Sequence, residues 1–179
     1  ACLVGSEMCI RDRCLVAYLC GHLPGAEVTL IDINPDRARI ASALGIAFSL
    51  PGDAPQNCDA VFHCSASAAG LATAMATAGD EATVLELSWY GATPIQAPLG
   101  GAFHSRQIRL QSSQVGHIAS SHRPRWTHRR RLHTAVQLLS DARLDCLLSP
   151  AIDFPQLPDH LPDLLGPRSD VLCCLIRYP

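Results

Sequence analysis

The sequence lacks several features that would assign it to a class at once. No apolar run in its 179 residues reaches the length of a membrane span. The net charge of −2 gives the whole chain no attraction for nucleic acid or an acidic membrane surface. Its nine cysteines form no C-x-x-C pair and no Cys/His ligand spacing. The scattered thiols therefore predict a reduced, cytoplasmic protein, with no metal site and no disulfide framework in this chain.

The apolar content of 48% is enough for one domain with a sizeable core, and the stretch 27–37 indicates its kind. Residues 27–32 are β-rich without strict alternation, which is typical of a strand covered on both faces. Asp32 ends this strand, and Asn34-Pro35 turns the chain into a helix. Ligands of doubly wound sheets bind beyond the carboxyl ends of the strands. Asp32 is thus either a carboxylate that accepts from the ribose hydroxyls of NAD or an ordinary helix cap.

Predicted helices and strands alternate along the chain, which favours a parallel sheet with right-handed crossovers, a Rossmann-like doubly wound α/β fold. A Pro/Gly-rich connection follows at 92–106, with a helical turn before Arg106, and 144–179 is Pro-rich and irregular with a last strand-like run at 171–176. We expect helices at 14–23, 37–44, 66–78 and 125–140, and strands at 27–32, 46–50, 60–64, 83–88 and 107–112. In the last helix, Leu132, Val136 and Leu139 share one face, which we expect to be buried.

Residues 2–13 match, over twelve consecutive positions, the translation of a common transposon-derived sequencing adapter. We therefore expect this segment to be non-native, as a fusion scar would be, and the true protein to begin near Cys14 with its upstream part missing. Three divisions follow: 1–13 as the adapter-derived segment, 14–143 as an incomplete NAD-binding domain, and 144–179 as a tail that returns towards a missing domain and packs poorly here.

Four stretches occur in an informative order: Val28-Thr29-Leu30-Ile31-Asp32-Ile33-Asn34-Pro35-Asp36-Arg37, Ala43-Leu44-Gly45-Ile46, Asp59-Ala60-Val61-Phe62-His63-Cys64-Ser65-Ala66 and Leu110-Gln111-Ser112-Ser113. With them, the chain from about Cys14 to Leu148 resembles the coenzyme domain of the medium-chain, zinc-containing alcohol dehydrogenase family. Segments 88–91 and 100–105 resemble a bacterial branch of that family.

The resemblance implies a set of cofactor-binding residues. Asp32 and Ile33 would follow the second strand at the adenosine ribose, with Arg37 beside it. The Asp32 carboxylate would favour NAD, because it would repel the 2′-phosphate of NADP. The remaining residues would meet the coenzyme mostly through their backbone after the fourth, fifth and sixth strands: Cys64, Ser65 and Ala66, then Leu87 and Ser88, then Ser113 and Gln114.

The chain also departs from the family. The family's first strand and Gly-rich phosphate loop are absent, and the three glycines would fall on Met8, Ile10 and Arg13. Those glycines permit close approach to the pyrophosphate, so we expect this chain to bind coenzyme poorly or not at all. The upstream catalytic domain, with its zinc ligands, is absent too. The apolar run 2–4 is expected to stand in for the first strand, with Ser6 as the helix cap.

Other reactive residues have simpler interpretations. His63 is expected to be a satisfied core histidine, because it and Cys64 point to opposite faces of a strand and cannot form a metal pair. The neighbours Cys173-Cys174 fail the same test. Glu86 is either a hydrogen-bonded core acid, which we prefer, or a polar group of the nicotinamide pocket. His104 and His117 read as solvated loop histidines.

The basic segment 122–131 interleaves arginines with Trp126, a pattern also found in nucleic-acid binding. No recognition motif accompanies it, so we expect the segment to be the solvated start of a helix. The second interpretation is that it docks against the missing domain or a coenzyme phosphate. Binding of nucleic acid is the third.

The sequence thus predicts part of an NAD-dependent, zinc-dependent dehydrogenase acting on a small alcohol or carbonyl substrate. This chain would carry no catalytic residue and no zinc ligand. We expect no membrane or nucleic-acid partner, and the sequence does not decide whether the protein forms a homo-oligomer. A zinc-free quinone or enone reductase of the same superfamily is one alternative. A non-catalytic nucleotide-binding domain is the other.

Overall fold

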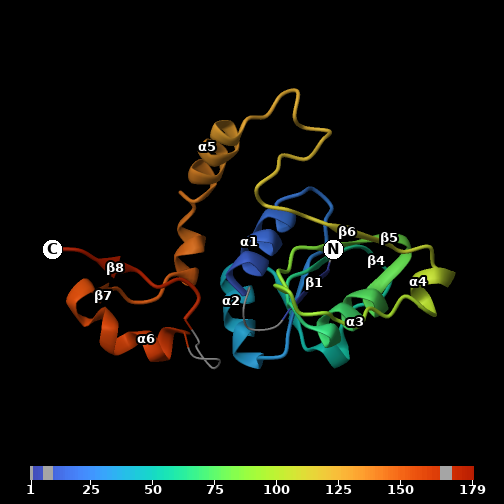
Figure 1. Ribbon diagram of the computed structural model, residues 1–179, viewed down its shortest axis with the longest axis horizontal. Coiled ribbons are helices and arrows are strands. Elements are labelled where there is room, and N and C mark those ends of the chain that lie inside the picture. Colours follow the sequence, from blue (N-terminus) through green and yellow to red (C-terminus); the bar gives the residue numbers. More distant parts are fainter. Residues whose placement is uncertain (1, 6–9, 166–170) are drawn as a thin grey trace.

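The computed structural model describes residues 2–5, 10–165 and 171–179. Its centre is a six-stranded sheet in the order β3-β2-β1-β4-β5-β6, with every neighbouring pair parallel (Figure 1). This order is that of the doubly wound dinucleotide-binding fold, which confirms the predicted class. The strands are β1 (Cys2–Gly5), β2 (Thr29–Asp32), β3 (Ala47–Ser49), β4 (Cys58–His63), β5 (Ala78–Glu86) and β6 (Arg109–Ser112).

Helices lie between the strands and continue beyond the sheet. The first part of the chain holds α1 (Ile10–Gly21), η2 (Pro35–Arg37), α2 (Ala38–Ala43), η3 (Pro51–Asp53), α3 (Ala68–Thr77) and α4 (Ala102–Ser105). The part after the sheet holds α5 (His128–Leu138), η4 (Ala142–Leu147), β7 (Ile152–Asp153), η5 (Phe154–Gln156), α6 (Leu157–Leu165) and β8 (Ile176–Arg177).

The sheet has an apolar core on each face, and helices cover both cores. Leu30 of β2 belongs to the core that includes residues of α1, α2 and η4, whereas its neighbour Ile31 belongs to the core beneath α3. Both side chains are fully buried. Successive residues of a strand point to opposite faces, so a strand covered on both sides needs apolar residues without alternation. The strand at 27–32 was predicted from this absence of alternation.

The segment Cys2–Gly5 occupies the central position of the sheet, where it pairs with β2 and β4. This is the replacement expected of the apolar run. The start of α1 follows, so Arg13 lies in its first turn. The expected cap at Ser6, and Met8 at the first of the three glycine positions, lie outside the described residues.

Strand β5 differs from its prediction. It begins at Ala78, directly after the last residue of α3, and not at Thr83. Gly79 therefore lies inside this strand. A Cβ at Gly79 would come within 3.1 Å of the Asn57 backbone, so the glycine serves the close approach of two chain segments.

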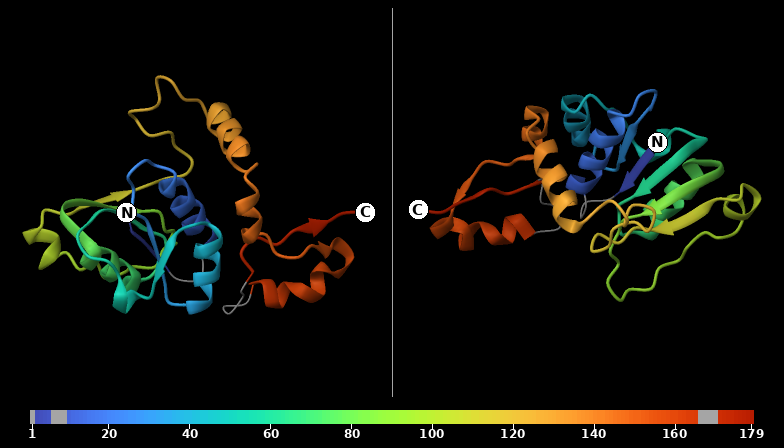
Figure 2. Two further views of the ribbon diagram at one scale, coloured as in Figure 1. Left: turned by 180° about the vertical axis from the view of Figure 1, so that it is seen from behind. Right: turned by 90° about the horizontal axis from the view of Figure 1, so that it is seen from above.

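The predicted burial of helix α5 is wrong. No residue of this helix is buried, and Leu132, Val136 and Leu139 are each more than half exposed. Figures 1 and 2 show α5 standing away from the sheet and its covering helices. Sequence periodicity identifies an apolar face, but it does not say whether another surface covers that face.

The C-terminal residues divide into a packed and an exposed part. Leu144 and Leu147 of η4 are buried in the core beside α1 and α2, so the expectation of a poorly packed tail is wrong at its start. Beyond η4, helix α6 was not predicted, and it has no buried residue. The predicted strand at 171–176 is reduced to β8 and a single bridge between Leu148 and Cys173.

One cysteine departs from the expectation of free thiols: Cys58, at the start of β4, is disulfide-bonded. The described free cysteines are Cys14, Cys20, Cys64, Cys146, Cys173 and Cys174.

Candidate functional site

A cavity of about 300 Å³ lies where three strands end at the carboxyl edge of the sheet. Cys64 follows β4, Leu87 follows β5 and Ser113 follows β6, and all three line it. Asp12 of α1 and Val115 also line it. The structure therefore brings together one residue from each of three of the four strand ends at which coenzyme contacts were predicted.

Hydrogen bonds that prolong the strand pairing hold this lining in place. The Leu87 N–H donates to the carbonyl oxygen of His63 at 2.9 Å, and the Ser113 N–H donates to that of Glu86 at 2.8 Å. The predicted residue Gln114 does not line the cavity; it is exposed, and its side-chain oxygen accepts from the backbone N–H of Gly116.

A hydrogen-bonded network lies directly behind the cavity wall. The His63 side chain is fully buried, with Nδ1 at 2.7 Å from Glu86 Oε2 and Nε2 at 2.5 Å from Ser65 Oγ. Glu86 Oε1 accepts from the Ser88 N–H at 2.8 Å, and Oε2 accepts from the Tyr90 hydroxyl at 3.0 Å. This confirms His63 as a satisfied core histidine and Glu86 as a paired acid.

The carboxylate fixes the direction of the hydrogen bonds in this network. An ionised Glu86 can only accept, so His63 Nδ1 carries a proton. In the neutral imidazole, Nε2 then accepts from the Ser65 hydroxyl. Hydrogen bonds from His63 and Ser88 outweigh burial and lower the pKa of Glu86 below its ordinary value. Burial and the neighbouring Glu86 carboxylate raise the pKa of the Tyr90 hydroxyl, which keeps it a donor.

The distances resemble those of a Ser–His–acid triad, but the location of Ser65 argues against a nucleophile. Ser65 is 2% exposed. Its hydroxyl accepts from the Ser67 N–H at 3.2 Å and is 2.9 Å from the Ser67 hydroxyl. A Cβ on Gly70 of α3 would collide with Ser65 Oγ and Cβ, so the serine points beneath that helix. The network therefore acts on the protein's own backbone and not on a substrate carbonyl.

The opposite end of the predicted site is closed by the chain itself. Asp32 ends β2 as expected, but it is only 2% exposed. Its Oδ2 lies 2.5 Å from Arg13 Nη1, and its Oδ1 accepts from the Asn34 N–H at 2.8 Å. Arg13 is fully buried and also donates to the Ile31 carbonyl at 3.1 Å. A ribose could reach the carboxylate only after Arg13 moved.

The other residues predicted at this end also have defined places. Arg37 is buried at the end of η2, whereas Ile33 is 57% exposed beside Asp32. Cys14 lies among Arg13, Asp32 and Arg37, and burial raises the pKa of its thiol to about 12. Burial thus disfavours the thiolate, the reactive form of a cysteine, at this position.

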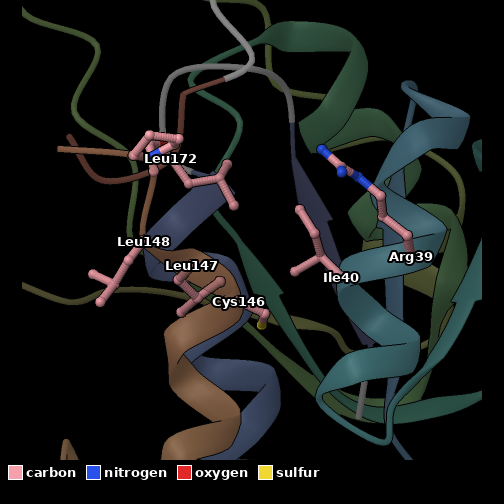
Figure 3. Close-up of a pocket in the computed structure, with 8 residues that line it drawn as sticks. Arg39, Ile40, Cys146, Leu147, Leu148 and Leu172 are labelled. Carbon is pink, nitrogen blue, oxygen red and sulfur yellow. The ribbon is translucent and has the colours of Figure 1, made fainter. Parts of the chain in front are cut away.

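Two further cavities differ in character. Figure 3 shows one of about 420 Å³ between α2 and the segment 146–150, where Arg39 is the charged lining residue and the rest are largely apolar. Another, of about 440 Å³, lies by the amino ends of β2 and β4, with Glu27 and Asp59 in its lining. Ligands of this fold bind at the carboxyl edge, so neither cavity is where a coenzyme is expected.

The remaining candidates are surface features. His104 and His117 are exposed, as predicted. In the basic segment, Arg130 stacks on Trp126 at 4.5 Å, and Arg131 donates to the carbonyls of Val115 and His117. These arginines hold the preceding loop against the start of α5, which fits a solvated helix start. Within the described ranges, no three His, Cys, Asp or Glu side chains gather as a metal site.

No helix in the described part of the chain combines the length and the apolar character needed to cross a membrane.

The comparisons with known proteins identify the fold. No family model matches the sequence, and no curated protein matches it. Solved structures do match, among them L-idonate 5-dehydrogenase from Escherichia coli, with a TM-score of 0.73 and 17% identity over 95% of this chain and 48% of that one. The fold is that of the alcohol dehydrogenases. The alcohol dehydrogenase TADH from Thermus sp. ATN1 gives a TM-score of 0.73 at 15% identity, over 99% of this chain and 51% of that one.

A third match is described as a short chain alcohol dehydrogenase from Escherichia coli CFT073 complexed with cofactor NADH. It has a TM-score of 0.68 and 14% identity, over 98% of this chain and 51% of that one. The chain thus spans about half the length of these dehydrogenases. At such identity the likeness confirms the predicted fold, that of the coenzyme half of the alcohol dehydrogenases, and leaves the activity to be argued from the site.

Proposed function

We propose that this chain is the coenzyme-binding half of an NAD-dependent oxidoreductase that moves hydride between the nicotinamide and an alcohol or carbonyl. The observation that carries the proposal is the cavity lined by Cys64, Leu87 and Ser113, which come from three separate strand ends. The likeness to alcohol dehydrogenases, one of them complexed with NADH, supports it. A cytoplasmic location belongs to the same proposal.

The nicotinamide end of such a coenzyme fits the cavity. Leu87 offers an apolar wall, and the Ser113 hydroxyl and neighbouring backbone offer polar groups to a carboxamide. The nicotinamide supplies the hydride chemistry when it is bound. The residues of this chain would hold its ring and exclude water from one face of it.

The adenosine end does not fit the chain as it stands. Both oxygens of Asp32 are engaged, by Arg13 and by Asn34. A coenzyme would have to displace a charge-assisted hydrogen bond between two buried groups, which is among the stronger side-chain interactions. We therefore expect weak coenzyme binding, limited by Arg13 at the adenosine subsite.

A zinc ion and the alcohol or carbonyl substrate belong to the complete enzyme in this proposal. A zinc ion there would polarise the substrate oxygen. Among the described residues no three His, Cys, Asp or Glu side chains gather as a metal site, so the proposal assigns no zinc ligand to them.

A fluorescence titration with NADH and NADPH, on the chain and on Arg13→Ala, tests the proposal. We expect weak NADH binding to the unaltered chain and tighter binding to Arg13→Ala, whose Asp32 is released. NADPH should bind the variant less well than NADH, because Asp32 repels a 2′-phosphate. If neither nucleotide binds either protein at millimolar concentration, the coenzyme proposal is wrong. A preference for NADPH in the variant would overturn the assignment of NAD.

A further inference from the structure

We infer that His63 and Glu86 are positioning residues for the nicotinamide end of the site, because they hold two of the loops that line its cavity in a closed ring of hydrogen bonds. The inference deepens the proposed function and rests on it. Neither side chain lines the cavity, so each acts through its neighbours.

The ring begins at the Glu86 carboxylate. Oε2 accepts from His63 Nδ1 at 2.7 Å, which ties β5 to β4. Oε1 accepts from the Ser88 N–H at 2.8 Å, which fixes the first turn of the chain after β5. One carboxylate therefore holds the end of β4 and the loop containing Leu87, a residue of the cavity wall.

Two further bonds close the ring through the other loop. The Ser88 hydroxyl accepts from the Ala66 N–H at 3.0 Å. The hydroxyl of Ser65, the residue before Ala66, lies 2.5 Å from His63 Nε2. The loop after β4, which contains Cys64, is thus held from both sides by the His63–Glu86 pair.

The backbone at the centre of this ring is unusual. Ala66 has a φ of 50°, in the left-handed region that a residue with a Cβ rarely adopts. Such a conformation persists only where the surroundings determine it, and it occurs preferentially at binding sites. The Ser88 hydroxyl holds this residue's N–H, so the ring maintains a conformation that the local sequence does not favour.

The charges around the ring are few. Glu86 and Tyr90 face His63 from β5 and the chain that follows, and Ser65 and Ser67 face it from the start of α3. Asp12 of α1 lines the cavity itself. Among these groups the Glu86 carboxylate is the one that bonds within the ring, and it orients the His63 Nδ1 and the Ser88 N–H.

The most direct test removes one hydrogen bond of the ring, the one between the Ser88 hydroxyl and the Ala66 N–H. Ser88→Ala removes the hydroxyl that accepts from Ala66 and leaves the buried pair intact, whereas Ser88→Thr keeps a hydroxyl. We expect Ser88→Ala to raise amide hydrogen exchange at Ala66 and to weaken NADH binding about tenfold, as the loss of one hydrogen bond implies. Binding of AMP, which has no nicotinamide, should not change, and Ser88→Thr should restore both properties.

Glu86→Gln should give the same pattern with a larger effect, because it removes the charge and replaces one of the two accepting oxygens with an NH2 group. Thr77→Val is the control: Thr77 is buried, and its hydroxyl donates within α3, to the carbonyls of Thr73 and Ala74. This control should change neither the exchange at Ala66 nor the ratio of NADH to AMP affinity.

Three results would overturn the inference: unchanged exchange at Ala66 in Ser88→Ala, an equal loss of NADH and AMP affinity, or the same pattern in Thr77→Val. If the unaltered chain binds neither NADH nor AMP, the proposed function fails and takes the nicotinamide role with it. The exchange at Ala66 is read without ligand, so that failure is distinguishable from a failure of the ring itself.

Discussion

Two acid–base pairs, one buried and one partly buried, lie at the carboxyl edge of the same sheet, and they relate to the candidate site in opposite ways. Arg13–Asp32 joins α1 to the end of β2 and occupies the carboxylate that a ribose would need. His63–Glu86 joins the ends of β4 and β5 and stays behind the cavity wall. One pair closes a subsite and the other supports one.

The difference follows from the chemistry of the two bases. A guanidinium is always charged and needs a carboxylate when it is buried, so Arg13 engages Asp32 permanently. An imidazole has two ring nitrogens, so His63 meets Glu86 through Nδ1 and passes the constraint on to Ser65 through Nε2. A buried acid–base pair at the carboxyl edge of a sheet therefore does not by itself indicate a ligand site. The hydrogen-bond partners of both side chains must be known first.

The largest expected effect comes from removing one member of the permanently charged pair. Arg13→Ala leaves Asp32 as a buried, uncompensated carboxylate, and it should lower the free energy of unfolding by roughly 3–5 kcal/mol. Urea denaturation at pH 7 measures this. The control is Arg11→Ala, which alters an exposed arginine two positions earlier in α1. It should change the free energy of unfolding by less than about 0.5 kcal/mol. Similar losses in the two variants would contradict the account.

A smaller effect is expected at the second pair. Glu86→Gln keeps the shape of the side chain and one acceptor, but it breaks the match to His63 Nδ1. The free energy of unfolding should fall by roughly 1–3 kcal/mol, the cost of a buried polar group left poorly bonded. A loss as large as that of Arg13→Ala would show that both pairs behave as buried charges, and the comparison would then fail.

Acid titration sharpens the comparison further. Because the pKa of Glu86 is lowered in the folded protein from its ordinary value of 4.5, its ionised form stabilises the fold. That stability is present above pH 4.5 and is lost as the pH falls through the folded pKa. The difference in unfolding free energy between the unaltered chain and Glu86→Gln should therefore shrink below pH 4.5. A difference that stays constant down to pH 3 would contradict the role of the carboxylate.

The smallest effect is expected at an exposed pair. Asp141 and Arg143 lie 2.6 Å apart on the surface, and hydrogen bonds from Arg143 hold the pKa of Asp141 well below its usual range. Solvent screens such pairs, and asparagine keeps the cap of η4, so Asp141→Asn should leave the unfolding midpoint within experimental error. A loss comparable to that of Glu86→Gln would mean that burial does not govern these pairs.

Much of the fold was predictable because local signals agreed with it. The apolar run 28–31, the turn at Asn34-Pro35 and the alternation of elements all favoured a doubly wound sheet. Cys64, Leu87 and Ser113 were expected at strand ends, and parallel strands necessarily bring their carboxyl ends to one edge. For these residues the order of elements along the chain was enough to predict their meeting.

The remainder depended on contacts between distant segments. The ring around Ala66 joins residues 63–66 to 86–90, and no spacing rule predicts a serine hydroxyl beneath the N–H of a left-handed alanine. The closure of Asp32 by Arg13 was missed because Arg13 was assigned to the adapter-derived segment, at a position where the family has a glycine. The exposure of Leu132 was missed because a periodic pattern identifies an apolar helix face but does not show whether another part of the protein covers it.

The most direct test of the central claim is a ¹H–¹⁵N NMR titration of the chain with NADH, with shifts assigned residue by residue. The account predicts shifts concentrated at Cys64, Ala66, Leu87, Ser88 and Ser113, with smaller ones around Asp32 while Arg13 remains in place. Shifts confined to the cavity beside Arg39, or none at millimolar NADH, would contradict the claim that the carboxyl edge of this sheet is a coenzyme site.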